Sequence, residues 1–255
     1  MLTANILIAD KDTKFVSMLK ARFEKNDFSV YASADVQTVW EVLDNHWVDL
    51  VVLGTGVKGV KNNIEFLKKL RAKKNFKTLP VVINTNDKIQ CKEQFKLLGV
   101  LNFFIRPFCI DLFIDEIKDI LTKKILVFGD NESTIKKVAS LLEKIGYQID
   151  VTTQASAFFS HVSVKWYSLL VIEYSCGKNI SDKMVSVVRT TLKNSLTPII
   201  IFNGSANENI AKDVKKKMIF FKEWASKIGN CDFLQAPYSI KKIKSFLIQH
   251  VDFFS

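Results

Sequence analysis

The chain of 255 residues repeats itself at an offset of 119 positions, and this repeat limits the folds it can adopt. Two apolar segments that run into acidic residues begin the copies, ILIADKD at 6–12 and ILVFGDN at 125–131. Trp47 then falls on Trp166 without a gap. The same offset relates further pairs: Phe23 with Leu142, Phe28 with Tyr147, Trp40 with Phe159, and the run 49–54 with 168–173. One hydrophobic pattern used twice predicts two units of one architecture.

The C-terminal parts of the copies also correspond, but the second copy is longer. Pro80 and Pro107 are 27 positions apart, whereas the matching Pro198 and Pro237 are 39 positions apart, a difference of 12. We therefore expect an insertion in the second copy near 206–222. The expected domains are residues 1–122 and 123–255.

Short apolar runs alternate with amphipathic stretches in each copy. In the stretch FVSMLKARFEK, for example, apolar residues recur at helical spacing. Strands that alternate with helices favour a parallel sheet covered by helices on both faces. The predicted fold class is therefore α/β, with one doubly wound parallel sheet in each copy. In the first copy the runs expected as strands are 4–9, 28–32, 49–53, 80–84 and 102–105.

The stretch DLVVLGTGVKGV contains Gly54, Gly56 and Gly59 in the spacing G-x-G-x-x-G, which is typical of dinucleotide-binding sites. Such a site needs a helix N-terminus directly after the glycines and an acidic residue about 20 positions later. The region about 20 positions after Gly59 reads KTLPVV, without an acid. We interpret the match as a coincidence.

The net charge of +11 is distributed unequally between the two halves of the chain. Residues 1–122 hold 18 Lys/Arg and 15 Asp/Glu (+3), and residues 123–255 hold 19 and 11 (+8). A basic surface of this kind attracts nucleic acid or anionic surfaces. However, the second half has one arginine, the residue that grips phosphates in fixed geometry, which favours a solvated lysine face instead. The residues of the basic patch are Lys212, Lys215, Lys216 and Lys217.

Cysteine spacing and hydropathy indicate in which cellular compartment the protein is located. The four cysteines form no C-x-x-C pair, which predicts free thiols in a reducing compartment. No apolar run approaches the roughly 18 residues that span a bilayer. The start MLTANILIADKD is too short in its apolar part for a signal peptide. We expect a cytoplasmic protein without membrane insertion.

Five segments of the first copy occur in the order and spacing of the receiver domains of two-component response regulators: ILIADKD, DLVVLG, NIEFLKKLR, LPVVINT and NFFIRPF. The second copy resembles the same family through ILVFGDN, SLLVIE, TPIIIFN and DFLQAPY. The resemblance implies two tandem flavodoxin-like (βα)5 domains with parallel five-stranded sheets. It also implies an Asp that accepts a phosphoryl group, two acids that help to hold Mg²⁺, and a hydroxyl and a Lys that contact phosphoryl oxygens.

The resemblance places these roles on residues that have largely lost the required chemistry. In domain 1 the acid pair falls on Asp10 and Lys11, the acceptor on Gly54, the hydroxyl on Thr85 and the Lys on Arg106. Glycine has no nucleophile, so this position cannot form an acyl phosphate. We also hypothesise that Lys11 pairs with Asp10 and fills the space of the metal.

In domain 2 the acid pair falls on Gly129 and Asp130, the acceptor on Glu173, the hydroxyl on Asn203 and the Lys on Ala236. Because Glu is one methylene longer than Asp, its carboxylate would extend outward and imitate a phosphoryl group. The alternative is a carboxylate left at a decayed site. Mg²⁺ is conceivable in domain 2 alone, and we expect no cofactor and no catalytic residue.

Some residues beside these positions allow two interpretations. Asp12 could replace a lost metal ligand, but we favour an N-cap of the following helix. Phe103 and Phe233 could report a conformational switch or belong to the core, and Pro107 and Pro237 follow the Lys positions. The Phe-rich end LIQHVDFFS could dock on a partner, form a homodimer, or pack on its own domain.

Three functions are compatible with these features of the sequence. The first is a response-regulator-like protein without an output domain, which is no enzyme and contacts a sensor kinase or another signalling protein without phosphorylation. The second is a receiver that accepts phosphate or Mg²⁺ in domain 2. The third is a module that binds nucleic acid or an anionic surface through the lysine-rich second domain.

Overall fold

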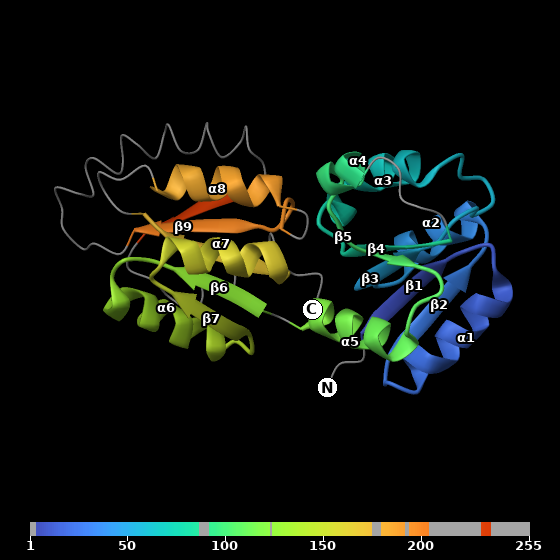
Figure 1. The fold of residues 1–255 in the computed structure, drawn as a ribbon, viewed down its shortest axis with the longest axis horizontal. Helices are drawn as coiled ribbons and strands as arrows, with labels where there is room; N and C mark the ends of the chain where they lie inside the picture. The colour runs from blue at the N-terminus through green and yellow to red at the C-terminus, as the bar shows by residue number, and fades with distance from the viewer. Residues whose placement is uncertain are drawn as a thin grey trace. The chain divides into compact units, whose positions relative to one another are not determined.

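The computed structural model describes residues 4–86, 92–122, 124–174, 180–191, 194–203 and 231–235. Contacts between residues divide the chain into two compact units, and the boundary falls between residues 122 and 123. Strands alternate with helices along the chain in the described part of the first unit and, up to residue 203, in that of the second (Figure 1).

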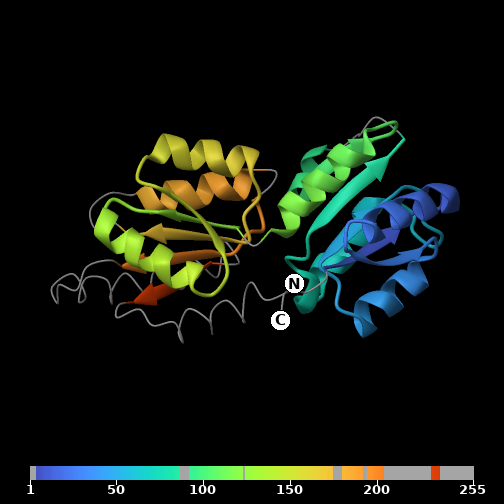
Figure 2. The ribbon, with the colours of Figure 1, turned by 90° about the horizontal axis from the view of Figure 1, so that it is seen from below.

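The first unit contains one five-stranded sheet in the order β2-β1-β3-β4-β5, in which all neighbouring strands are parallel. Helices lie on both sides of this sheet (Figure 2). Its elements are β1 (Asn5–Ala9), α1 (Thr13–Glu24), β2 (Ser29–Ser33), α2 (Val36–Asn45), β3 (Leu50–Leu53), α3 (Asn63–Ala72), a 3-10 turn (Lys74–Phe76), β4 (Val81–Thr85), α4 (Lys92–Leu97), β5 (Val100–Ile105) and α5 (Ile110–Leu121).

The second unit contains a parallel sheet in the order β10-β9-β8-β6-β7, which is the order of the first sheet read from its other edge. The predicted α/β class with parallel sheets is thus confirmed. The elements described for this unit are β6 (Lys124–Phe128), α6 (Glu132–Glu143), β7 (Gln148–Thr152), α7 (Ala155–Val164), β8 (Leu169–Glu173), α8 (Ile180–Thr190), β9 (Ile199–Asn203) and β10 (Cys231–Gln235).

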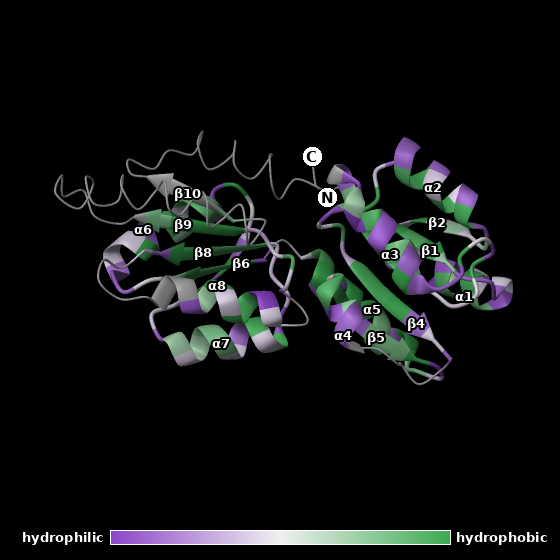
Figure 3. Cartoon of the chain, turned by 90° about the horizontal axis from the view of Figure 1, so that it is seen from above, coloured by the Kyte–Doolittle hydropathy of each residue, from purple (hydrophilic) through white to green (hydrophobic). Residues whose placement is uncertain are grey.

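The core of the first unit lies on both faces of its sheet. Strand β3 is buried along its whole length, as expected for a central strand covered by helices. On one face Phe23 of α1 meets Phe113 of α5, with ring centroids 5.7 Å apart. On the other face Trp40 of α2 meets Phe66 of α3 at 5.1 Å. Hydrophobic residues accordingly concentrate on the strands and the inner sides of the helices (Figure 3).

One arginine near the end of the third helix binds backbone carbonyls in each unit. Arg71 donates to the carbonyl oxygens of Phe76, Leu79 and Leu98 at 2.8, 2.9 and 2.8 Å. Arg189 donates to the carbonyl oxygen of Thr197 at 2.8 Å. Leu79 and Thr197 each precede the proline at the start of the fourth strand, so the two arginines are equivalent. Burial lowers the pKa of both guanidinium groups, to about 9 for Arg71 and about 10 for Arg189.

Several predicted features lie outside the described residues. They are the insertion 206–222, the basic patch Lys212, Lys215, Lys216 and Lys217, the site positions Ala236 and Pro237, and the Phe-rich end. Within the part of the chain that the structure describes, no helix combines the length and apolar character needed to cross a bilayer.

Candidate functional site

Asp10 and Gly54 lie side by side where β1 and β3 end. The strand register pairs Ala9 with Leu53, and the Gly54 amide donates to the Ala9 carbonyl at 2.7 Å. Asp10 is 1% exposed, and its carboxyl group occupies the space above Gly54, where an added Cβ would overlap it. Any residue with a side chain at position 54 would therefore displace Asp10.

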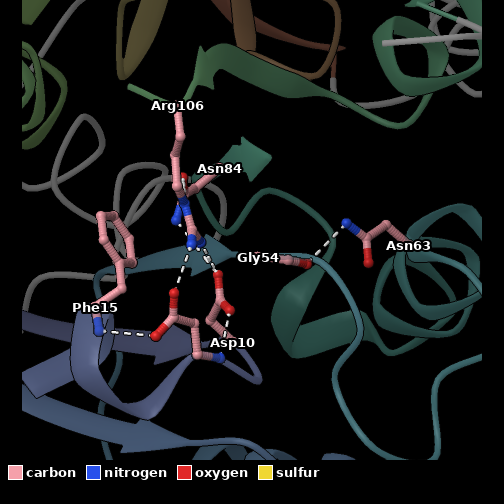
Figure 4. Close-up of polar contacts among 7 residues, drawn as sticks. Asp10, Phe15, Gly54, Asn63, Asn84 and Arg106 are labelled. Carbon is pink, nitrogen blue, oxygen red and sulfur yellow. Dashed lines mark hydrogen bonds and ion pairs between the residues drawn. The ribbon is translucent and has the colours of Figure 1, made fainter. Parts of the chain in front are cut away.

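Arg106, directly after β5, points to the ends of β1 and β3 and pairs with Asp10 (Figure 4). We call the site of Asp10, Gly54 and Arg106 the first pocket, and the equivalent site of the second unit the second pocket. Its Nη2 contacts Asp10 Oδ2, and its Nη1 lies 3.4 Å from Asp12 Oδ2. Its Nε donates to Asn84 Oδ1 at 2.8 Å. The guanidinium group also lies 3.7 Å from the centroid of the Phe15 ring, a favourable cation–π position. The side chain of Arg106 is 12% exposed, so the cation is held on nearly every side.

Two residues of this cluster were not predicted as site residues. Asn84, in β4, is fully buried and donates to Asp10 Oδ2 at 3.4 Å as well as accepting from Arg106. Phe15, in the first turn of α1, supplies the ring beneath the guanidinium. Asn84 could have been found as a polar residue inside the apolar run LPVVINT, next to Thr85. No comparable sequence signal distinguishes Phe15 from a core phenylalanine.

The hypothesis that Lys11 pairs with Asp10 is wrong, because Arg106 takes this place. Lys11 is exposed, and its side chain passes beside Gly56. Burial raises the pKa of Asp10, while the amide of Asp12 and the cation of Arg106 act in the opposite direction. The guanidinium group of Arg106 is bonded to the carboxylate of Asp10, which Mg²⁺ would need as a ligand. A guanidinium group has no electron pair to offer a metal. The arrangement of these side chains therefore does not fit Mg²⁺.

The other predicted positions of the first unit surround this pair. Thr85 is buried at the end of β4, and its carbonyl oxygen accepts the Arg106 amide at 2.8 Å. Arg106 and Pro107 are joined by a cis peptide bond. Phe103, in β5, packs edge-on against Phe95 of α4 with ring centroids 5.7 Å apart, as a packing role requires. Asp12 caps α1 by accepting the Phe15 amide at 3.0 Å, so the N-cap prediction is confirmed.

In the second unit Gly129 and Glu173 lie beside each other, because the register pairs Phe128 with Ile172. Glu173 is 6% exposed, and its Oε2 accepts the amide of Asn131 at 3.0 Å. The amide of Asp130 also bonds to this carboxylate. Burial raises the pKa of Glu173, and the two amides oppose this change. The expectation that the carboxylate extends outward is wrong, since it turns back to the loop after β6.

Two further predicted positions of the second unit lie on β9 and β10. Asn203 ends β9 and Phe233 lies in β10, where the register pairs it with Ile201. In the described part of the chain, no group of three or more His, Cys, Asp or Glu residues is arranged to hold a metal ion.

Comparison with protein families matches residues 6–118 to the response regulator receiver domain. A probable transcriptional regulator, ycf29 of Cyanophora paradoxa, is 25% identical over 71% of this chain and 85% of its own length. The sporulation initiation phosphotransferase F of Bacillus subtilis is 26% identical over 49% of this chain and 98% of its own length. 

Among solved structures, the chemotaxis response regulator CheY4 of Vibrio cholerae covers 46% of this chain and 98% of its own, with 18% identity and a TM-score of 0.42. A response regulator of Thermotoga maritima covers 47% and 98%, with 19% identity and a TM-score of 0.42. The match to the receiver model runs from β1 into α5 of the first unit. By the match to the family model, residues 6–118 are a response regulator receiver domain.

Proposed function

We propose that this chain contains two receiver-like domains and acts in two-component (phosphorelay) signalling through protein contacts that do not depend on phosphorylation. The partner would be a sensor kinase or another signalling protein. The domain boundaries at residues 122 and 123 follow the compact units. The second domain is included because its sheet has the strand order of the first, and because its sequence repeats the first at an offset of 119.

The arrangement of Asp10, Gly54 and Arg106 supports this proposal most directly. The acceptor position of the receiver holds glycine, which has no atom that can attack phosphorus. The space above it is filled by a carboxylate that is already neutralised by Arg106. The guanidinium group of Arg106, which could otherwise attract a phosphoryl group, is already engaged by Asp10 and Asn84. The paired side chains of Asp10 and Arg106 thus occupy the place where a phosphoryl group would bind.

The second pocket supports the same conclusion for a different reason. Glu173 is a carboxylate at the acceptor position, but it is buried and bonded to the amides of Asp130 and Asn131. Attack on phosphorus would require it to break these bonds and turn outward. The phosphotransferase named among the relatives handles phosphoryl groups according to its name. Of the two acceptor positions in this chain, Gly54 and Glu173, the second carries the carboxylate.

Incubation of the full chain with Mg²⁺ and acetyl phosphate, followed by intact-mass measurement, tests the proposal. We expect no phosphoryl adduct on the wild-type protein, because neither pocket offers a carboxylate that is free to attack. Glu173→Ala is the control variant, and its spectrum should be the same as that of the wild type.

An adduct that appears on the wild type and disappears in Glu173→Ala would contradict the proposal and make the second unit a phosphoryl acceptor. An adduct that persists in Glu173→Ala would also contradict it, since it would identify an acceptor elsewhere. The phosphodonor has to be shown active in the same experiment on a receiver that retains its acceptor aspartate.

A further inference from the structure

In both units a buried carboxylate holds the loop that follows the first strand, although the two carboxylates come from different strands. In the first unit the amide of Asp12 donates to Asp10 Oδ1 at 2.9 Å. In the second unit the amide of Asn131 donates to Glu173 Oε2 at 3.0 Å. Asn131 lies at the position of Asp12 after the offset of 119. The same backbone amide therefore has the same kind of acceptor in both units.

A glycine lies beside each carboxylate on the neighbouring strand. A Cβ placed on Gly54 would meet Asp10 through all three of its nearest atoms. A Cβ placed on Gly129 would meet Glu173 through two of its three nearest atoms, and Ile135 through the third. Neither Gly54 nor Gly129 has positive φ, so space rather than backbone conformation explains these glycines. One carboxyl group fills the gap between the two strand ends and leaves no room for a second side chain.

We propose that Glu173 is the transposed equivalent of Asp10. In the first unit Asp10, which follows β1, positions the loop after β1. In the second unit the carboxylate of Glu173, at the end of β8, positions the loop after β6. The additional methylene of glutamate provides the reach across from the neighbouring strand. The glycine in each pair makes room for the carboxylate. This inference concerns how each pocket is held together, and it stands whether or not the protein contacts a signalling partner.

The loop that each carboxylate holds also begins a helix. The side chain of Asp12 accepts the Phe15 amide at 3.0 Å, and that of Asn131 accepts the Thr134 amide at 3.1 Å. Each capping residue is thus fixed through its own amide by the buried carboxylate, while its side chain caps the helix. Loss of the carboxylate should loosen the first turn of the helix before it affects the rest of the unit.

The first test measures hydrogen exchange of the Asn131 amide in the full chain and compares Glu173→Asp with Glu173→Gln. Glu173→Asp keeps the charge but loses the reach, so we expect protection to fall about tenfold or more, the equivalent of one hydrogen bond to a charged group. Glu173→Gln keeps the reach and an acceptor oxygen, so protection should stay within about threefold of the wild type. If the aspartate variant protects Asn131 as well as or better than the glutamine variant, the proposal is wrong.

The second test transposes the carboxylate within the first unit. Asp10→Gly should lower the protection of the Asp12 amide about tenfold or more, and Asp10→Gly/Gly54→Glu should restore it to within about threefold of the wild type. The Asp12 amide proton should then also follow the titration of the new carboxyl group in its chemical shift, which a change in stability alone does not produce.

Asp10→Gly/Gly54→Gln is the matched control, with the same size but no charge for Arg106, and its Asp12 amide should show no such titration. Protection in the glutamate double variant no better than in Asp10→Gly would overturn the proposal. If the double variant fails to fold while Asp10→Gly folds, the proposal is also overturned. If neither folds, the comparison of Glu173→Asp with Glu173→Gln decides.

Discussion

Arg106→Ala should lower the free energy of unfolding of the first unit by about 3 kcal/mol, because it leaves the carboxylate of Asp10 buried without its counter-charge. Asp10 is 1% exposed and the side chain of Arg106 12%, so water replaces little of the lost interaction. The substitution also removes the donor to Asn84 Oδ1. Urea unfolding followed by tryptophan fluorescence measures the change.

Acid should reduce this loss. Burial already raises the pKa of Asp10 in the wild type, and without Arg106 the amide of Asp12 is left to oppose this increase. A group whose pKa is higher in the folded state than in the unfolded state stabilises the protein at low pH and loses this contribution as the pH rises. For an aspartate the stabilisation is complete below the unfolded pKa of about 3.9. The difference between wild type and variant should therefore be smaller near pH 4 than at pH 7.

The control for this prediction is Arg22→Ala. Arg22 pairs with Asp111 at 4.0 Å, and their side chains are 48% and 76% exposed. Such a surface pair contributes about 0–1 kcal/mol. Equal losses in the two arginine variants, or a loss in Arg106→Ala that grows toward acid pH, would contradict a buried ion pair in the pocket.

Arg71→Ala should also cost about 3 kcal/mol, since it leaves several carbonyl oxygens without their donor in a poorly hydrated place. The guanidinium group connects the end of α3 to the residues before β4 and to Leu98 before β5. Arg71→Lys should recover less than half of the loss, because one ammonium group cannot point at carbonyls on several sides. Urea unfolding of the full chain gives both values.

Lys73→Ala is the matched control for Arg71, since it removes a cation from the same end of the same helix. Lys73 pairs with Asp44 at 2.8 Å and lies 4.5 Å from the Trp40 ring centroid, but its side chain is 45% exposed. We expect a loss below about 1 kcal/mol. If Arg71→Lys is as stable as the wild type, charge and not the geometry of the guanidinium group holds these segments together.

The fold could be predicted from the sequence because its signals are local. Buried central strands appear as continuous apolar runs, and the predicted strand 49–53 agrees with β3 to within one residue. The repeat doubles each signal. By contrast, the hydrogen bonds of Arg71 join α3 to the residues before β4 and before β5, and those of Arg189 join α8 to the residues before β9. Their equal distance from Pro80 and Pro198 is visible in the sequence, but the carbonyls that they bind are not.

The sequence predicts part of the candidate site, but not Asn84, Phe15 or the pairing of Asp10 with Arg106. Asp10, Gly54, Thr85 and Arg106 follow or end neighbouring strands, so the topology brings them together. Which cation meets Asp10 depends on the direction of side chains. Lys11 is adjacent in sequence yet lies at the surface, whereas Arg106 arrives from β5 and is held by Asn84 and Phe15. In the same way the rotamer of Glu173, which the sequence does not specify, decides that its carboxylate faces the loop.

The claim that both pockets are closed by their own carboxylates is tested most directly by the amide spectrum of the isotopically labelled full chain. Mg²⁺ and acetyl phosphate would be titrated while the amide resonances of Asp12, Gly54 and Asn131 are followed. We expect these resonances to stay at their positions throughout, because Asp10 is engaged by Arg106 and Glu173 by the amides of Asp130 and Asn131. Saturable shifts at Asp12 and Gly54, or at Asn131, would show that a pocket accepts a ligand and would contradict the claim.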